Sequence, residues 1–250
     1  MKTTLQVPFP RGTCAIEVFG TPEDRAAPVV LLFMDVFGPR PALFGIGRRL
    51  AEAGYRVLLP DLFYDHQPFA PLNTAAVFAG DPAERKRMMG KYQSLDQARI
   101  DADVRALLSW AEGELGPQAP AAAVGYCMGG RYALTAAAEA SRVVLAASVH
   151  GGNLAPESGD GPHLRLKGIA ARVYVGVAAI DPTFGAAEEG RLACALREAG
   201  VDHIIETYAG AVHGFAMNDL PTHHAAAYQR HWTRLSALLA EAFQPSRSTS

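Results

Sequence analysis

The chain has 250 residues, of which 49% are hydrophobic and 19% are charged, and its formal net charge is −2. A chain of this size can bury a large core, so we expect one α/β domain over residues 1–250. The charge leaves no basic surplus for nucleic acid, and no apolar stretch is long enough to cross a membrane. With this charge, a small neutral or mildly anionic molecule is the expected partner. Three scattered cysteines exclude a disulfide framework and favour a reducing compartment, so we expect a cytoplasmic protein.

The predicted elements begin with two strands that alternate apolar and polar residues, at 5–7 and 14–18, with a hairpin connection between them. Six short apolar runs follow, each typical of a strand buried on both faces: 29–34, 57–59, 121–126, 143–149, 173–178 and 204–208. Five helical patterns lie among or after them: 43–53, 95–111, 131–140, 186–199 and 222–242. This alternation predicts a mainly parallel sheet of about eight strands with helices on both faces, and a ligand site beyond the carboxyl ends of the strands.

Residues 63–91 interrupt the alternation with prolines, aromatic residues and the charged run 84–87. Loops of this length in a compact domain usually have a function. We therefore predict a partial lid over the site at 63–91. A solvated surface excursion is the alternative interpretation.

The most specific motif is Gly-Tyr-Cys-Met-Gly at 125–129, which lies between an apolar strand and an Ala-rich helix. This is the pattern of a nucleophile elbow with cysteine in place of serine. A tight strand-to-helix turn needs small residues two positions to either side of the nucleophile, and Gly125 and Gly129 provide them. The helix N-terminus favours a thiolate at Cys127. A buried structural cysteine in a Gly-rich turn is the alternative.

A thiolate nucleophile needs an imidazole and an acid that orients it, in the chain order nucleophile, acid, histidine. Asp181 follows the strand at 173–178, and His213 lies after the strand at 204–208. Both therefore belong at the same sheet edge as Cys127. Asp61 also follows a strand, but that strand precedes the elbow. No His-x-x-Glu pattern or acidic cluster points to a metal.

Together with the Asp35-Val36-Phe37-Gly38 turn and the Pro60-Asp61-Leu62 stretch, these motifs resemble the dienelactone hydrolase family over most of the chain. The resemblance implies an eight-stranded α/β-hydrolase fold, no cofactor, and hydrolysis of an enol-lactone through a cysteine acyl-enzyme. It also implies an oxyanion hole formed by the backbone N–H groups of Val36 and Met128. The predicted enzyme is a carboxylic ester hydrolase similar to carboxymethylenebutenolidase.

Two positions depart from the pattern of that family. Asp35 stands where the family has a glutamate that modulates the nucleophile, and it is one methylene shorter. The family binds a substrate carboxylate with two arginines. Arg85 matches the first, but Met217 occupies the second position, four residues after His213. Without that forked guanidinium, bidentate carboxylate recognition is weaker.

The residues expected to line the substrate pocket are Phe37, Tyr64, Arg85, His150 and Met217. His150 caps the strand at 143–149 and has a second interpretation as a structural histidine. Two other functions stay open at this point. One is a catalytically silent binding module that keeps the pocket. The other is a glutamine-amidotransferase-type cysteine enzyme, although such enzymes place a histidine soon after the glycine of the nucleophile, where this chain has Gly130.

Overall fold

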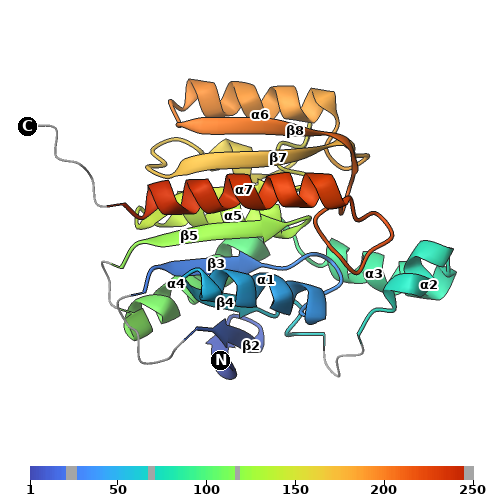
Figure 1. Ribbon diagram of the computed structural model, residues 1–250, viewed down its shortest axis with the longest axis horizontal. Coiled ribbons are helices and arrows are strands. Elements are labelled where there is room, and N and C mark those ends of the chain that lie inside the picture. The colour runs from blue at the N-terminus through green and yellow to red at the C-terminus, as the bar shows by residue number, and fades with distance from the viewer. Residues whose placement is uncertain (21–26, 67–70, 116–118, 245–250) are drawn as a thin grey trace, which may run out of the picture.

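The computed structural model describes residues 1–20, 27–66, 71–115 and 119–244. At its centre lies an eight-stranded sheet in the order β1-β2-β4-β3-β5-β6-β7-β8 (Figure 1). The strands are β1 (Lys2–Phe9), β2 (Gly12–Phe19), β3 (Val29–Phe33), β4 (Arg56–Pro60), β5 (Ala121–Tyr126), β6 (Val143–Val149), β7 (Arg172–Ile180) and β8 (His203–Val212). The β1–β2 and β2–β4 pairs are antiparallel, and all other neighbours are parallel.

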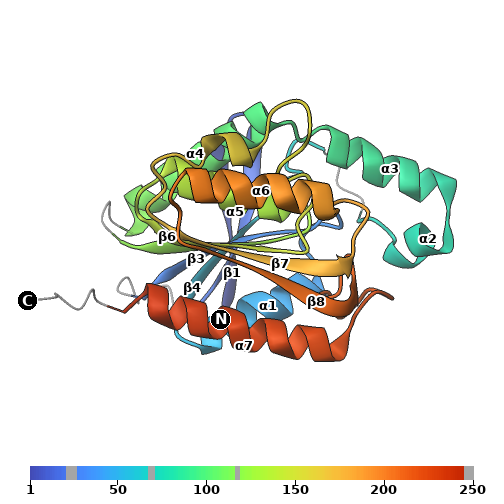
Figure 2. The ribbon, with the colours of Figure 1, turned by 90° about the horizontal axis from the view of Figure 1, so that it is seen from above.

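Helices cover both faces of the sheet, as Figure 2 shows. One face carries α1 (Pro41–Glu52) and α7 (Ala225–Ala242), and the other carries α4 (Gln97–Leu115), α5 (Gly129–Glu139) and α6 (Ala186–Glu198). A short 3₁₀ helix at Pro162–Arg165 precedes β7. Every residue of β3, β4 and β5 is buried, as expected for parallel strands between two helical layers. The predicted mainly parallel sheet with helices on both faces is confirmed.

The segment at 63–91, which we predicted as a lid loop, contains two helices. They are α2 (Thr74–Ala79) and α3 (Pro82–Gln93), and both lie beyond one end of the sheet (Figures 1 and 2). The Asn73 and Asp81 side chains accept hydrogen bonds from the Ala76 and Glu84 amides and so cap the two helices. The prediction of a loop was wrong because α2 is short and because proline is compatible with the first turn of α3. Residues 67–70 of the segment lie outside the described residues.

Among the residues that the structure describes, none of the helices combines the length and the apolar character of a membrane span. The buried apolar side chains pack into one cluster that includes residues from all eight strands. The carboxyl ends of β3, β5, β7 and β8 meet at the edge of the sheet from which α2 and α3 project (Figure 1). The sequence places its candidate catalytic side chains at this edge.

Candidate active site

Cys127 occupies a tight turn between the end of β5 and the start of α5. Its backbone φ is +54°, a left-handed conformation that a side chain other than glycine rarely adopts. A Cβ atom on Gly125 would lie 1.9 Å from the Gly129 carbonyl oxygen, and one on Gly129 would lie 2.5 Å from the Phe33 carbonyl oxygen. Both positions therefore require glycine, for a packing reason that the sequence pattern anticipates. Strained backbone at residues other than glycine clusters at active sites, so the conformation of Cys127 favours a functional role for this turn.

The three predicted catalytic side chains lie in one hydrogen-bonded chain. The Cys127 Sγ is 3.1 Å from the His213 Nε2, and the His213 Nδ1 is 2.7 Å from the Asp181 Oδ2. Asp181 directly follows β7, and β8 extends to Val212, so His213 stands directly at the end of its strand. Thr183 holds the acid in place, because its backbone N–H and its hydroxyl both donate to the Asp181 Oδ1, at 2.8 and 2.7 Å.

This arrangement favours a protonated imidazole. Burial by itself lowers the pKa of His213, but the charge of Cys127 and the hydrogen bond that the imidazole donates to the Asp181 carboxylate outweigh it and raise that pKa to about 10. The Asp181 side chain is almost fully buried, so its carboxylate acts on the imidazole with little screening by water. The geometry therefore favours a positively charged imidazole beside the Cys127 sulfur.

The turn after β3 lies against the elbow, because Gly129 packs on the Phe33 and Met34 carbonyl groups. In this turn, Val36 lines the same cavity as Cys127 and Met128. Neither the Val36 N–H nor the Met128 N–H has a hydrogen-bond acceptor among the residues that the structure describes. Two free donors beside a nucleophile are the arrangement that an oxyanion hole requires.

Asp35 also borders the cavity, but its carboxylate is directed to Arg40. The Arg40 guanidinium donates to both Asp35 oxygens, at 2.5 and 2.8 Å, and the Phe37 N–H donates to one of them at 3.0 Å. No hydrogen bond joins Asp35 to Cys127 within the described ranges. Burial raises the pKa of Asp35 while the charge of Arg40 opposes that shift. In this structure Asp35 shapes the turn and does not contact the nucleophile, so its modulation of Cys127 stays a prediction.

Arg40 continues the contact to the loop after β8. Its Nε donates to the Asp219 Oδ2 at 2.6 Å, and its second Nη donates to the Asp219 Oδ1 at 3.1 Å. Asp219 lies six residues after His213 in the sequence. Arg40 therefore connects the turn that carries the Val36 N–H to the loop that follows the imidazole.

The cavity above Cys127 has a volume of about 510 Å³, within the range of small-molecule sites. Of the residues predicted for the site, the structure brings these to the cavity: Asp35, Val36, Phe37, Arg85, Cys127, Met128, His150 and His213. Tyr64 and Met217 do not reach it. The Tyr64 hydroxyl donates to the buried Asp103 at 2.7 Å, and Met217 is fully buried in the core. Their predicted contact with substrate is therefore wrong.

His150 and Arg85 occupy opposite environments in this cavity. His150 is buried, its ring centroid is 5.3 Å from that of His213, and neither of its ring nitrogens has a partner in the described structure. Burial and the charge of His213 hold its pKa well below the usual range, so the ring is neutral. Arg85 is exposed on α3, and its Nε donates to the Val77 carbonyl at 3.0 Å, which ties α3 to the end of α2.

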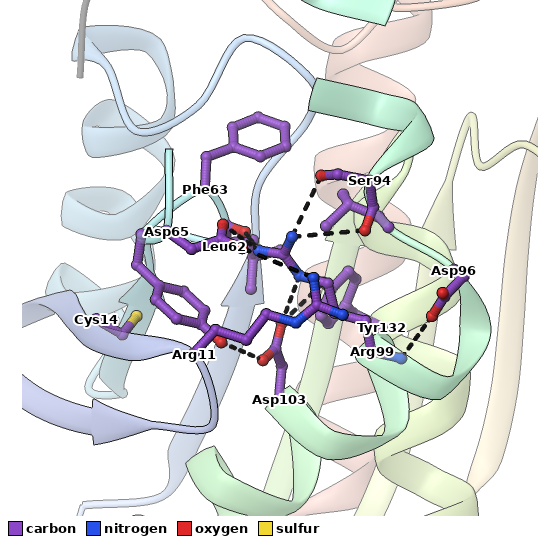
Figure 3. Close-up of polar contacts among 12 residues, drawn as sticks. Arg11, Cys14, Leu62, Phe63, Asp65, Ser94, Asp96, Arg99, Asp103 and Tyr132 are labelled. Carbon is purple, nitrogen blue, oxygen red and sulfur yellow. Dashed lines mark hydrogen bonds and ion pairs between the residues drawn. The ribbon is translucent and has the colours of Figure 1, made fainter. Parts of the chain in front are cut away.

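A buried arginine on α4 fixes both ends of the segment that contains α2 and α3 (Figure 3). At the start of the segment, the Arg99 guanidinium donates to the Leu62 carbonyl at 3.1 Å and to the Asp65 carboxylate at 2.6 Å. At its end, the guanidinium donates to the Ser94 hydroxyl at 3.2 Å. Asp103 lies 3.5 Å from the Arg99 Nε on the same helix. The buried, positively charged Arg99 side chain therefore holds both ends of the segment that forms the wall of the cavity.

A model of the dienelactone hydrolase family matches residues 17–243 of the chain. The chain belongs to the dienelactone hydrolase family. The resemblance drawn from the elbow, the order of the three side chains and the Asp35–Gly38 turn is confirmed. Because the chain belongs to this family, the observed sheet and helices are those of an α/β-hydrolase fold.

Individual members of this family are distant from the chain. A "Putative carboxymethylenebutenolidase" of Escherichia coli O157:H7 is 25% identical over 218 residues, covering 85% of this chain and 76% of the relative. A carboxymethylenebutenolidase of Pseudomonas sp. is 30% identical over 118 residues, or 47% of this chain and 48% of the relative. The solved structure of a "Putative Dienelactone Hydrolase" of Klebsiella pneumoniae has a TM-score of 0.79 at 22% identity, covering 96% of this chain and 98% of that chain. At this low identity, the structural match supports the shared fold alone.

Within this member of the dienelactone hydrolase family, the sequence reasoning missed three kinds of residue. It missed Thr183, although Asp-Pro-Thr is a turn sequence that predicts a bond back to the aspartate. It missed Arg40, whose spacing from Asp35 gives no signal outside the folded turn. It also missed the apolar residues of α2 and α3 that line the cavity, Val77, Phe78, Met88 and Met89, because it treated that segment as a loop.

Proposed function

We infer that the protein is a cysteine-dependent hydrolase of small esters or lactones, with Cys127 as the nucleophile, His213 as the acid–base and Asp181 as the orienting acid. The observation that carries this proposal is the continuous contact from the Cys127 sulfur through the His213 imidazole to the Asp181 carboxylate, beside a cavity of about 510 Å³. Membership of the dienelactone hydrolase family supports the same reaction class.

In the proposed reaction, the Cys127 thiolate attacks the carbonyl carbon of the ester. The new C–S bond places negative charge on the carbonyl oxygen, which the Val36 and Met128 N–H groups stabilise. The C–O bond to the leaving group then breaks, and the departing oxygen takes the proton from the His213 Nε2. A water molecule attacks the thioester while His213 accepts its proton, and release of the acid restores the thiolate.

The environment of Asp181 supports its proposed role. An acid that is held by Thr183 and almost fully buried keeps the imidazole in one orientation, with its Nε2 toward the sulfur. In the proposed free enzyme, the short Asp181–His213 contact also stabilises the positive charge of the imidazole beside the thiolate. His150 is neutral and unpaired, so it can donate or accept one hydrogen bond at the substrate.

The test is hydrolysis of p-nitrophenyl acetate by the wild type, by Cys127→Ala and by Cys194→Ala. Cys194 is an exposed cysteine on α6 and provides the matched control for loss of a thiol. We expect Cys127→Ala to reduce kcat by about 10³-fold or more, while Cys194→Ala keeps the wild-type rate. Equal rates for the wild type and Cys127→Ala would refute the proposal.

The two alternatives from the sequence predict other outcomes in the same assays. A wild-type protein that binds small esters but hydrolyses none of them would be a silent binding module. A protein that releases ammonia from glutamine and does not cleave esters would be an amidotransferase-type enzyme.

A further inference from the structure

The wall that α2 and α3 contribute to the cavity is apolar. Phe78 stacks on Phe37 with ring centroids 6.1 Å apart, and Val77, Met88 and Met89 extend the same surface. Phe78 and Met89 are 40% and 42% exposed, which is unusual for side chains of this size, and both line the cavity. Large apolar side chains that stay exposed at the rim of a cavity indicate an apolar ligand.

The order of the strands indicates which part of an ester meets this wall. The leaving oxygen of the ester must face the His213 Nε2, since that nitrogen supplies its proton. Asp181 and His213 follow β7 and β8, on one side of β5 in the sheet, whereas Phe37 follows β3 on the other side. An ester bound at Cys127 with its leaving group toward His213 therefore extends its acyl chain toward Phe37.

Charged groups around this path do not suit a carboxylate on the acyl chain. Asp35 is an acid, and its partner Arg40 uses both edges of its guanidinium on Asp35 and Asp219. Arg85 stands at the exposed rim and bonds the Val77 carbonyl through its Nε. His150 is neutral. A carboxylate carried along this path would lose water and meet apolar side chains.

We propose that the substrate of this protein is an ester with an uncharged aliphatic acyl chain, which binds against Phe37, Phe78 and Met89. This inference rests on the proposed function, because it assigns the substrate class of the same site. It separates the protein from hydrolases that recognise a carboxylate on the acyl part of their substrate. The cavity selects for chain length by contact with apolar side chains, and it selects against charge by desolvation.

The first experiment compares p-nitrophenyl acetate, butanoate and hexanoate with the wild-type protein. Each added methylene that leaves water for the wall should raise kcat/KM by about three- to fourfold, until the chain outgrows the cavity. p-Nitrophenyl pentanoate and p-nitrophenyl hemisuccinate have acyl chains of similar length, and only the second ends in a carboxylate. We expect the hemisuccinate to react at least about tenfold more slowly in kcat/KM.

The second experiment locates the effect. Phe78→Ala and Met89→Ala should each lower the ratio of kcat/KM for hexanoate over acetate by about three- to tenfold, with the folded state checked by circular dichroism. Leu164→Ala is the matched control, because Leu164 is a large apolar side chain that is 63% exposed and does not line this cavity. It should leave the ratio unchanged.

Two results would overturn the inference. One is a wild-type kcat/KM that does not change from acetate to hexanoate. The other is a preference for the hemisuccinate that disappears in Arg85→Gln, which would assign a carboxylate ligand to that arginine. Either result leaves the cysteine mechanism intact as long as Cys127→Ala abolishes the hydrolysis of acetate. Failure of the proposed function is distinct, since Cys127→Ala would then hydrolyse every ester as fast as the wild type.

Discussion

The floor of the cavity and its wall are built in different ways. On the floor, Cys127, Asp181 and His213 each stand directly at the end of a strand, and hydrogen bonds join them to one another. The wall consists of two helices outside the sheet, with exposed apolar side chains and with a buried charge at its base. In the proposed reaction, the chemistry that needs fixed distances takes place at the ends of the strands, and contact with the variable part of a substrate lies on a separate segment.

A change in the floor should affect every ester equally, whereas a change in the wall should affect esters according to their acyl chains. The largest effect is expected for His213→Ala, because in the proposed reaction it removes both the partner of the thiolate and the proton donor for the leaving group. We expect kcat for p-nitrophenyl acetate to fall by about 10³-fold or more. His203→Ala, at the opposite end of β8, is the control and should retain activity. Loss of activity in both variants would mean that the strand, and not the imidazole, had been disturbed.

Asp181→Asn should have the next largest effect, about 10²-fold on kcat, and should also change the pH profile. In the wild type, the pKa of His213 is raised to about 10, so the imidazole is protonated below that pH and the rate should fall as the pH rises through it. Without the carboxylate, that pKa is lower and the fall begins at a lower pH. The rate measured from pH 6 to pH 11 tests this.

Asp202→Asn, whose aspartate is exposed and lies at the other end of the sheet, should leave the profile unchanged. An alkaline limb that is the same in Asp181→Asn and the wild type would contradict the assignment.

Arg40→Ala tests whether the floor depends on the link between the Asp35–Gly38 turn and the His213 loop. It leaves Asp35 buried without its partner and frees the turn that carries the Val36 N–H. We expect kcat to fall about tenfold for acetate and hexanoate alike, with little change in KM. Arg40→Lys should recover only part of the loss, because lysine cannot bond both oxygens of both carboxylates. Arg48→Ala, at an exposed position on α1, the helix that Arg40 directly precedes, serves as the control. A change in KM alone would assign Arg40 to substrate binding.

Arg99→Gln should have the smallest effect on acetate hydrolysis and should act on the wall. It removes the group that holds Leu62, Asp65 and Ser94, and it leaves Asp103 buried without its cation. We expect the free energy of unfolding in urea to fall by about 3 kcal/mol. The preference for hexanoate over acetate should weaken as well. Arg105→Gln, on the same helix but with an exposed ion pair to Glu139, should change stability by less than about 1 kcal/mol. Equal stability losses for the two variants would argue against the anchoring role of Arg99.

The contrast between floor and wall also describes how far the sequence could predict the site. The elbow was predictable because its Gly-x-Cys-x-Gly pattern is local: Gly125 has no room for a Cβ beside Gly129 of the same turn, and Gly129 has none beside the Phe33 carbonyl of β3. The chain order of Cys127, Asp181 and His213 then placed three side chains at one sheet edge, because parallel strands bring their carboxyl ends together. The helices of the wall were missed because a six-residue helix has no strong periodicity.

The residue pattern alone predicts the strands, the covering helices and the candidate nucleophile with its imidazole and acid, since these follow from local sterics and from the apolar patterns of buried elements. The neighbours that specialise the site follow from the packing of the folded chain. It paired Asp35 with Arg40 and Asp219, buried Met217 in the core and turned Tyr64 toward Asp103. These choices depend on segments far apart in the chain packing against one another, and no local pattern of residues encodes such contacts.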